Sequence, residues 1–208
     1  AREEWSFDAA PVNPANRFFI PELVRHLTRD AIFVDAGAYD GRVTLELLKR
    51  VGTVRQAHLF EPDAENNRLL ETTLSTLPAD IRARMTLHPV ALADSVGSVS
   101  FSRGFGLASR LDGPNSAMVA TTTLDACALA PGFIKLHLEG GELAALRGAL
   151  HTLTTHRPLL SLTVYHTRDG LWQTAQWLRT YLPRYRFYFR VHSWCGTGAV
   201  IYAIPEER

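Results

Sequence analysis

Short apolar runs alternate along the chain with segments in which apolar residues recur at helical spacing. Apolar runs bounded by polar residues or proline are typical of buried strands, and helical spacing is typical of helices that cover a sheet. The expected strands are 31–34, 58–60, 85–93, 133–139, 159–166, 186–191 and 199–204. The expected helices are 21–28, 43–51, 63–77, 142–156 and 170–182. This alternation predicts an α/β fold with a mostly parallel seven-stranded sheet and helices on both faces.

The last two expected strands are joined by a short connection that contains Gly196 and Gly198, so we expect an antiparallel hairpin at the C-terminal edge. A shorter pair of strands, 98–101 and 120–124, flanks a loop rich in glycine and serine from Arg103 to Ser116. Long irregular loops of this kind are often functional or disordered.

The 208 residues fit one domain, in which residues 1–30 are expected to form a polar lead and a first helix, a possible lid. Residues 31–208 are expected to form the cofactor-binding domain. The net charge of +1 gives no reason to expect nucleic acid, and no apolar run is long enough to span a membrane. Cys127 and Cys195 form no metal or redox motif and fit a reducing, cytoplasmic location.

The stretch from residue 31 to residue 41 reads AIFVDAGAYDG, an apolar run that ends in Asp35 and continues into a turn of small residues. A buried strand, a tight turn and a helix N-terminus in this order form the ligand-binding half of a βαβ unit. Dinucleotide sites use Gly-x-Gly-x-x-Gly, whereas here Gly37 and Gly41 are separated by three residues. The carboxylates of Asp35 and Asp40 would repel a pyrophosphate and favour an ammonium or sulfonium centre. The turn therefore favours S-adenosylmethionine (SAM) as the ligand.

A second expected strand ends in Glu61. We call the turn that contains Gly37 and Gly41 the glycine turn. Glu61 lies about 20 residues after it, where a carboxylate can accept hydrogen bonds from ribose hydroxyls. NAD and SAM both carry a ribose, so Glu61 supports a nucleoside ligand without choosing between them. An ordinary strand, turn and helix without a ligand, and a solvated Glu61, remain the simpler alternatives at this point.

Five successive segments resemble the motifs of FkbM-type SAM-dependent methyltransferases: VDAGAYDG, FEPDAENNRLL, VALAD, TTLDA and FIKLHLEGGELAALRGA. The resemblance covers roughly residues 33–166. Its most specific piece is 134–149, in which the matching residues are Lys135, Glu139, Gly140, Glu142, Leu146, Gly148 and Ala149. The resemblance implies a single Rossmann-like class I methyltransferase domain. It also implies methyl transfer from SAM to oxygen, often on sugars or polyketide-type natural products.

By this resemblance, Asp35, Gly37 and Gly41 hold the methionine end of SAM. Glu61 takes the ribose, and the turn 90–94 lies by the adenine. The expected cofactor-binding residues are Asp35, Gly37, Tyr39, Asp40, Gly41, Glu61, Pro62, Ala91, Leu92 and Asp94.

Three residues depart from the family pattern on the expected reaction side of the site. His137 stands where the family usually has aspartate, Tyr39 where asparagine is common, and Tyr165 where an acid usually precedes the histidine that is His166 here.

A hydroxyl acceptor must lose a proton, and a nearby histidine or carboxylate can take it. We expect His137 or His166 to be the general base and Glu139 to orient the base or bind the acceptor. Lys135, His137 and Glu139 alternate in the expected fourth strand and would share one face. Lys135 is expected to be a structural ion-pair partner, and a structural His137 or a helix-capping Glu139 remains an alternative. His137, Glu139 and His166 are also plausible ligands of a divalent metal ion. Their spacing is no known metal signature, so a metal site stays an alternative and is not the prediction.

These features predict SAM-dependent O-methylation of a small hydroxylated acceptor, a saccharide or another natural product. Two alternatives remain. One is a SAM-binding or interaction domain that has lost catalysis, motivated by His137 and Tyr39. The other is a nicotinamide-dependent oxidoreductase, disfavoured by the missing Gly-x-Gly-x-x-Gly. The run 184–190 interleaves arginines with aromatic residues, as a nucleic-acid surface can. We prefer an edge strand whose outer face is covered by arginine stems.

Overall fold

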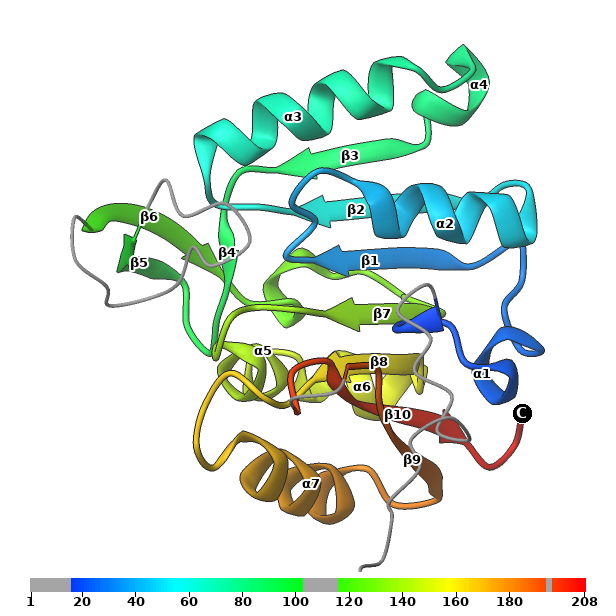
Figure 1. Ribbon diagram of the computed structural model, residues 1–208, viewed down its shortest axis with the longest axis vertical. Coiled ribbons are helices and arrows are strands. Elements are labelled where there is room, and N and C mark those ends of the chain that lie inside the picture. Colours follow the sequence, from blue (N-terminus) through cyan, green and yellow to red (C-terminus); the bar gives the residue numbers. More distant parts are fainter. Residues whose placement is uncertain (1–15, 103–115, 194–195) are drawn as a thin grey trace, which may run out of the picture.

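A computed structural model describes residues 16–102, 116–193 and 196–208. Most of the expected lead, the loop 103–115 and Cys195 therefore lie outside the described residues. The strands of the main sheet are β1 Ile32–Ala36, β2 Gln56–Phe60, β3 Met85–His88, β7 Phe133–Leu136, β8 Leu159–Thr163, β9 Tyr185–Val191 and β10 Ala199–Pro205. Their order is β3-β2-β1-β7-β8-β10-β9 (Figure 1). The first five strands in this order, β3, β2, β1, β7 and β8, pair in parallel. β10 pairs antiparallel with β8 and β9. The predicted fold class, with its C-terminal hairpin, is confirmed.

Helices cover both faces of this sheet. They are α1 Pro21–Val24, α2 Arg42–Val51, α3 Ala64–Ser75, α4 Ala79–Arg82, α5 Glu142–Arg147, α6 Leu150–His156 and α7 Gly170–Tyr181. One buried apolar cluster contains Leu146 of α5 and Leu178 of α7, and the other contains Leu23 of α1, Leu47 of α2 and Leu70 of α3. Alternate residues of β1 belong to the two clusters, so the clusters lie on opposite faces. None of the helices in the described part of the chain has the length and hydrophobicity needed to span a membrane.

A small second sheet projects beyond the carboxyl edge toward which the arrowheads of β1, β2, β3 and β7 point (Figure 1). It consists of β4 Ala91–Leu92, β5 Gly97–Ser102 and β6 Ser116–Thr122, in the order β4-β6-β5. The predicted pairing of β5 with β6 is confirmed. The prediction of one strand over 85–93 was wrong. Pro89 has no N–H with which to continue the ladder, and the chain leaves the main sheet there before β4 pairs with β6.

Two further expectations need correction. The expected helix 142–156 is interrupted at Gly148 and Ala149, where it divides into α5 and α6. The expected fourth strand ends at Leu136, so His137 and Glu139 do not alternate along a strand. Glu139 instead has a left-handed φ of +51°, and the chain turns away toward α5. The fifth strand likewise ends at residue 163, ahead of His166. β9 lies at the edge of the sheet, as expected from its arginine-rich sequence.

A pair of histidines joins β2 to the end of β3. Nδ1 of His58 lies 3.0 Å from Nε2 of His88, and the ring of His88 stacks on Phe60 with centroids 4.3 Å apart. Burial lowers the pKa of His58, and burial together with the His58 ring lowers the pKa of His88. The pair therefore favours neutral rings in the folded protein.

We expect the protein to lose stability as the pH falls from 7 to 5. The pKa values of His58 and His88 are lower in the folded chain than the value of 6.5 for an unperturbed histidine. Below pH 6.5 the unfolded chain consequently binds more protons, and the free energy of unfolding falls with pH. Thermal melts should show a smaller fall in Tm for His88→Gln than for the wild type. The exposed His151 provides the control, since His151→Gln should behave as the wild type. An unchanged fall in His88→Gln would contradict this account.

Candidate active site

The turn after β1 brings the backbones of β1, β2 and β7 together. Gly37 has a φ of +74° and Gly41, the N-cap of α2, a φ of +81°. The amides of Gly37 and Ala38 donate to the carbonyl oxygen of Phe60 at 2.9 and 3.0 Å. A Cβ atom on Gly37 would lie 1.9 Å from the carbonyl oxygen of His137. Glycine is therefore required at position 37 by both its φ and this close approach.

Asp35 lies beneath the turn in a fully buried ion pair. Its Oδ1 is 2.8 Å from Nζ of Lys135, and its Oδ2 accepts from the Thr44 hydroxyl at 2.8 Å. Nζ of Lys135 also donates to the carbonyl oxygens of Ala36 and Gly37 at 3.2 and 2.7 Å. The ammonium thus ties the carboxylate to the turn, as expected of a structural ion-pair partner. Asp35 is 0% exposed, and its role at the methionine end of SAM stays a prediction.

Glu61, which directly follows β2, lies beside the same turn. Its carboxylate accepts from the amides of Tyr39 and Asp63 at 2.9 Å each, and from Nδ2 of Asn66 at 3.3 Å. Burial raises the pKa of Glu61, against the lowering effect of these hydrogen bonds. Asp63 is the N-cap of α3, so Pro62 precedes the helix and does not occupy its first turn. The structure brings Glu61 to the glycine turn; its contact with a ribose stays a prediction.

The remaining expected cofactor residues lie around the turn and at β4. Asp40 is partly buried and forms an ion pair with the exposed Arg42, whose Nε lies 2.7 Å from its Oδ2. Ala91 and Leu92 are buried in β4, and the exposed Asp94 accepts from the neighbouring Ser95 hydroxyl.

The break between α5 and α6 lies directly beside the segment that follows β4. A Cβ atom on Gly148 would lie 2.0 Å from the carbonyl oxygen of Ala93. The turn expected near the adenine therefore packs directly on the interrupted helix.

His137, Glu139 and His166 meet where β7 and β8 end, and we call these three residues the His-Glu-His cluster. Nε2 of His137 is 2.9 Å from Oε1 of Glu139, and Nε2 of His166 is 3.3 Å from Oε2 of the same carboxylate. The two imidazole rings stack with centroids 5.0 Å apart. The amide of His137 donates to the carbonyl oxygen of Ala36 at 3.0 Å, so the cluster adjoins the glycine turn.

Glu142 supports this cluster and was missed as a site residue. Its Oε1 lies 2.9 Å from Nδ1 of His166 and accepts from the Thr163 hydroxyl at 2.6 Å. The same carboxylate accepts from the amides of Leu138 and Gly140 at 3.0 and 2.9 Å. The match of Glu142 to the family motif was the only signal in the sequence, because a first-turn glutamate normally looks like part of a helix start.

The three side chains of the cluster differ in their pKa values and therefore in their charges. Burial lowers the pKa of His137 to about 4, with help from the positive charges of Lys135 and Arg17 and against the carboxylate of Glu139. Burial also lowers the pKa of His166, but the flanking carboxylates outweigh it and raise the value to about 9. Burial opposes ionisation of Glu139, and contact with the two histidines reverses this and lowers its pKa to about 2. At neutral pH His137 is therefore neutral, His166 cationic and Glu139 anionic.

Residues from the N-terminal segment reach this cluster. Arg17 donates to the hydroxyl of Tyr165, which lies 3.4 Å from Nε2 of His137. The Arg17 guanidinium lies over the rings of Phe18 and Tyr165, and the Phe18 ring centroid is 6.0 Å from that of His137. Sequence reasoning singled out Tyr165 only as a departure from the family and gave no signal for Arg17, which is separated from it by 148 residues.

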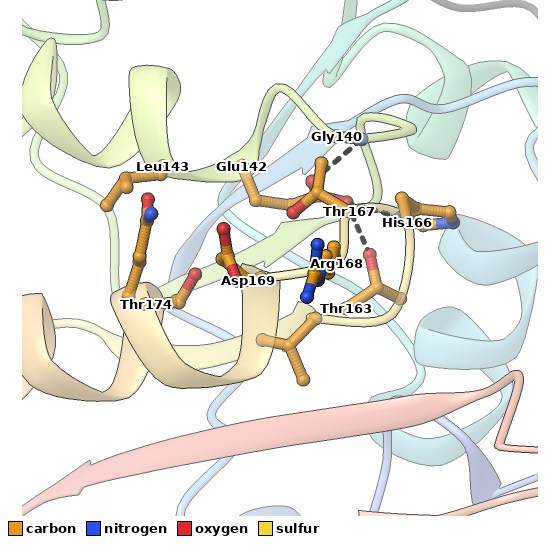
Figure 2. A pocket seen from close by; sticks show the side chains of 12 residues that line it. Gly140, Glu142, Leu143, Thr163, His166, Thr167, Arg168, Asp169 and Thr174 are labelled. Carbon is orange, nitrogen blue, oxygen red and sulfur yellow. Dashed lines mark hydrogen bonds and ion pairs between the residues drawn. The ribbon is translucent and has the colours of Figure 1, made fainter.

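A cavity of about 250 Å³ opens beside the cluster, between the end of β8 and the starts of α5 and α7. Glu142, Thr163 and His166 lie on one side of it, and Leu143 and Thr174 lie on the other (Figure 2). His166 is thus the member of the His-Glu-His cluster that lines this cavity.

Comparison with known proteins places these features in a family. The chain is similar to an FkbM methyltransferase from Methylobacillus flagellatus, with 24% identity and a TM-score of 0.77 over 91% of this chain and 47% of that one. It therefore spans about half the length of that protein. It also resembles a SAM-dependent O-methyltransferase from Thermotoga maritima, with 15% identity and a TM-score of 0.58 over 94% and 66% of the two chains. A precorrin-6Y C5,15-methyltransferase from Geobacter metallireducens shows 14% identity and a TM-score of 0.54 over 92% and 85%.

These structural similarities identify the class I methyltransferase fold. No curated protein matches the sequence significantly. The family model of the methyltransferase FkbM domain matches residues 35–189, which contain the glycine turn, Glu61 and the His-Glu-His cluster. This membership implies SAM as the methyl donor and leaves the nicotinamide alternative without support. The chain therefore belongs to the FkbM methyltransferase domain family.

Proposed function

We propose that the protein transfers the methyl group of SAM to a hydroxyl of a small-molecule acceptor. The observation that carries this proposal is the contact between the His-Glu-His cluster and the glycine turn. The carbonyl oxygen of Ala36 accepts from the amide of His137, and Gly37 packs on the His137 carbonyl. The imidazole of His137, which can accept a proton, therefore adjoins the glycine turn, where the family resemblance implies that SAM binds.

The residues around the turn fit SAM. Glu61 accepts three hydrogen bonds from the chain, and a carboxylate has about four acceptor positions, so it retains capacity for a ribose hydroxyl. In our proposal Gly37, Tyr39, Asp40 and Gly41 line the methionine end. The remaining expected residues lie near the ribose and adenine and are Pro62, Ala91, Leu92 and Asp94.

When bound, SAM supplies a sulfonium methyl carbon that the acceptor oxygen attacks, forming the C–O bond as the C–S electron pair passes to sulfur. His137 is the proposed base because it is neutral near pH 7, whereas His166 already carries a proton. With Nε2–H donated to Glu139, Nδ1 of His137 is the atom that receives the hydroxyl proton. Glu139 orients the imidazole and stabilises the cation that forms.

Calorimetric titration with S-adenosylhomocysteine, the demethylated product, tests the cofactor half of this proposal. We expect micromolar binding by the wild type and a loss of about 10- to 100-fold in Glu61→Ala, as for the removal of hydrogen bonds to a charged group. Glu65→Ala removes a neighbouring exposed carboxylate and should leave binding unchanged. Circular dichroism and thermal melts establish that each variant is folded. Undiminished binding by folded Glu61→Ala would remove Glu61 from the ribose site, and no binding by the wild type would overturn the cofactor assignment.

The acceptor half is tested with isotopically labelled SAM and matched sets of hydroxyl, amine and carboxylate acceptors. Label should appear in hydroxylated small molecules, and the transfer should be lost in folded His137→Ala that still binds S-adenosylhomocysteine. Transfer confined to amines would overturn the proposed oxygen acceptor. Cofactor binding without transfer to any acceptor would favour the inactive alternative.

A further inference from the structure

We propose that His137, Glu139 and His166 together hold one divalent first-row transition-metal ion. Each residue offers one ligand atom, and these three atoms lie within 4.8 Å of one another. The separations of 2.9 and 3.3 Å between the carboxylate oxygens and the two Nε2 atoms match neighbouring ligands of one ion. For metal–ligand distances of about 2.1 Å, adjacent ligands at right angles stand about 3 Å apart. This inference deepens the proposed function and rests on it for its chemistry.

The backbone places the carboxylate between the imidazoles at an energetic cost. Glu139 has a φ of +51°, a left-handed conformation that costs a residue other than glycine about 1–2 kcal/mol. Such conformations persist where the surrounding structure enforces them, often at functional sites. The parallel pairing of β7 with β8 brings His166 to the same point, although it is distant in sequence.

A second and independent feature is the support given to His166. Its Nδ1 lies 2.9 Å from Oε1 of Glu142, which the amides of Leu138 and Gly140 and the Thr163 hydroxyl hold in place. Histidines that bind metals commonly donate their second ring N–H to a carboxylate in this way.

The arrangement leaves the other ring nitrogen of His166 aimed into the cluster. The His166 side chain is 8% exposed, and its Nε2 faces Oε2 of Glu139 at 3.3 Å, an ion-pair contact without the geometry of a regular hydrogen bond. When a metal ion binds, Nε2 of His166 releases its proton and becomes a ligand, while the carboxylate of Glu142 holds the ring on its far side.

The donor set indicates the kind of ion and its use. Two imidazoles and one carboxylate suit first-row transition metals better than Mg²⁺ or Ca²⁺, which prefer oxygen ligands. Three protein ligands leave coordination positions open for an acceptor, and the cavity that His166 lines lies beside the cluster. An ion in the cluster would lower the pKa of a bound acceptor hydroxyl, which would release its proton to solvent water. The acceptor oxygen would then bond to the methyl carbon of SAM as the C–S electron pair passes to sulfur. His137 is then a ligand, and the ion replaces it as the group that activates the acceptor.

The test uses the full chain without a histidine tag, treated with chelator, dialysed and titrated with Co²⁺. We expect one Co²⁺ per chain by elemental analysis, with visible d–d absorption that reports nitrogen and oxygen ligands. His137→Ala, Glu139→Gln and His166→Ala should each abolish the absorption. Glu142→Gln should weaken binding about 10- to 100-fold, as for other residues that support a ligand. His151→Ala, on the exposed side of α6, should bind as the wild type.

S-adenosylhomocysteine titration of the same samples separates this inference from the proposed function. Binding of S-adenosylhomocysteine without binding of Co²⁺ would overturn the metal site and leave His137 as the base. Equal Co²⁺ binding by the wild type and by folded His166→Ala would also overturn it. Binding of Co²⁺ without S-adenosylhomocysteine would support the metal site while removing the cofactor from the proposed function.

Discussion

Asp35→Ala is expected to destabilise the protein by about 3–5 kcal/mol, because it leaves the Lys135 ammonium buried without its counter-charge. For a domain of this size, the loss corresponds to a fall in Tm on the order of 10 °C. The two remaining partners of the ammonium, the carbonyl oxygens of Ala36 and Gly37, carry no compensating charge. The turn should therefore loosen, and cofactor binding should weaken together with stability.

Thermal and urea unfolding of a matched set measures this effect. Lys135→Met should be destabilised similarly, whereas the double variant Asp35→Ala/Lys135→Met should lose less than the sum of the single variants. Lys49→Met removes an exposed lysine and serves as the control. A Tm of Asp35→Ala within a few degrees of the wild type would contradict the role given to the ion pair. Loss of binding by Asp35→Ala alone cannot identify a direct ligand contact.

Gly37→Ala is expected to cost about 2–5 kcal/mol, the sum of a left-handed φ and a steric clash. The added methyl group would lie 1.9 Å from the carbonyl oxygen of His137, a backbone atom fixed by the pairing of β1 with β7. Relief requires that the turn or the start of the His-Glu-His cluster moves. S-adenosylhomocysteine binding should therefore fall with stability.

Gly52→Ala is the control for Gly37→Ala. Gly52 has a φ of +80°, but the nearest atom to an added Cβ is 4.0 Å away, at the end of the Arg29 side chain. This variant should consequently show the conformational cost alone, about 1–2 kcal/mol, with unchanged cofactor binding. Chemical denaturation gives both values. Equal losses in the two variants would show that the contact with His137 contributes nothing.

The sheet could be predicted because its strands are buried on both faces and read as continuous apolar runs. Ile32–Ala36 and Leu159–Thr163 are examples, and the paired strands of the hairpin share a short connection. Element ends were less predictable, because tertiary contacts decide them. Gly148 interrupts a good helical pattern where the Ala93 carbonyl packs against it, and the turn at Glu139 shortens β7.

The proximity of Asp35 and Glu61 could be predicted for the same reason, since residues at the ends of neighbouring parallel strands meet at one edge of the sheet. The ion-pair and hydrogen-bond partners of those acids could not be predicted. Asp35 looks like a free carboxylate in the sequence, yet its ammonium partner lies 100 residues away. Glu142 and Arg17 belong to the site only through contacts that form after the sheet and the N-terminal segment have packed.

The burial of Lys135 also affects the chemical reactivity of the chain. The sequence contains two lysines, and the side chain of Lys49 is 74% exposed whereas that of Lys135 is 1% exposed. The Lys135 side chain is enclosed by the protein and its ammonium donates to three oxygen atoms, so acylating and alkylating reagents cannot reach its nitrogen. To such reagents the folded chain presents a single reactive lysine, Lys49, and Lys135 becomes reactive only when the turn that contains Gly37 opens.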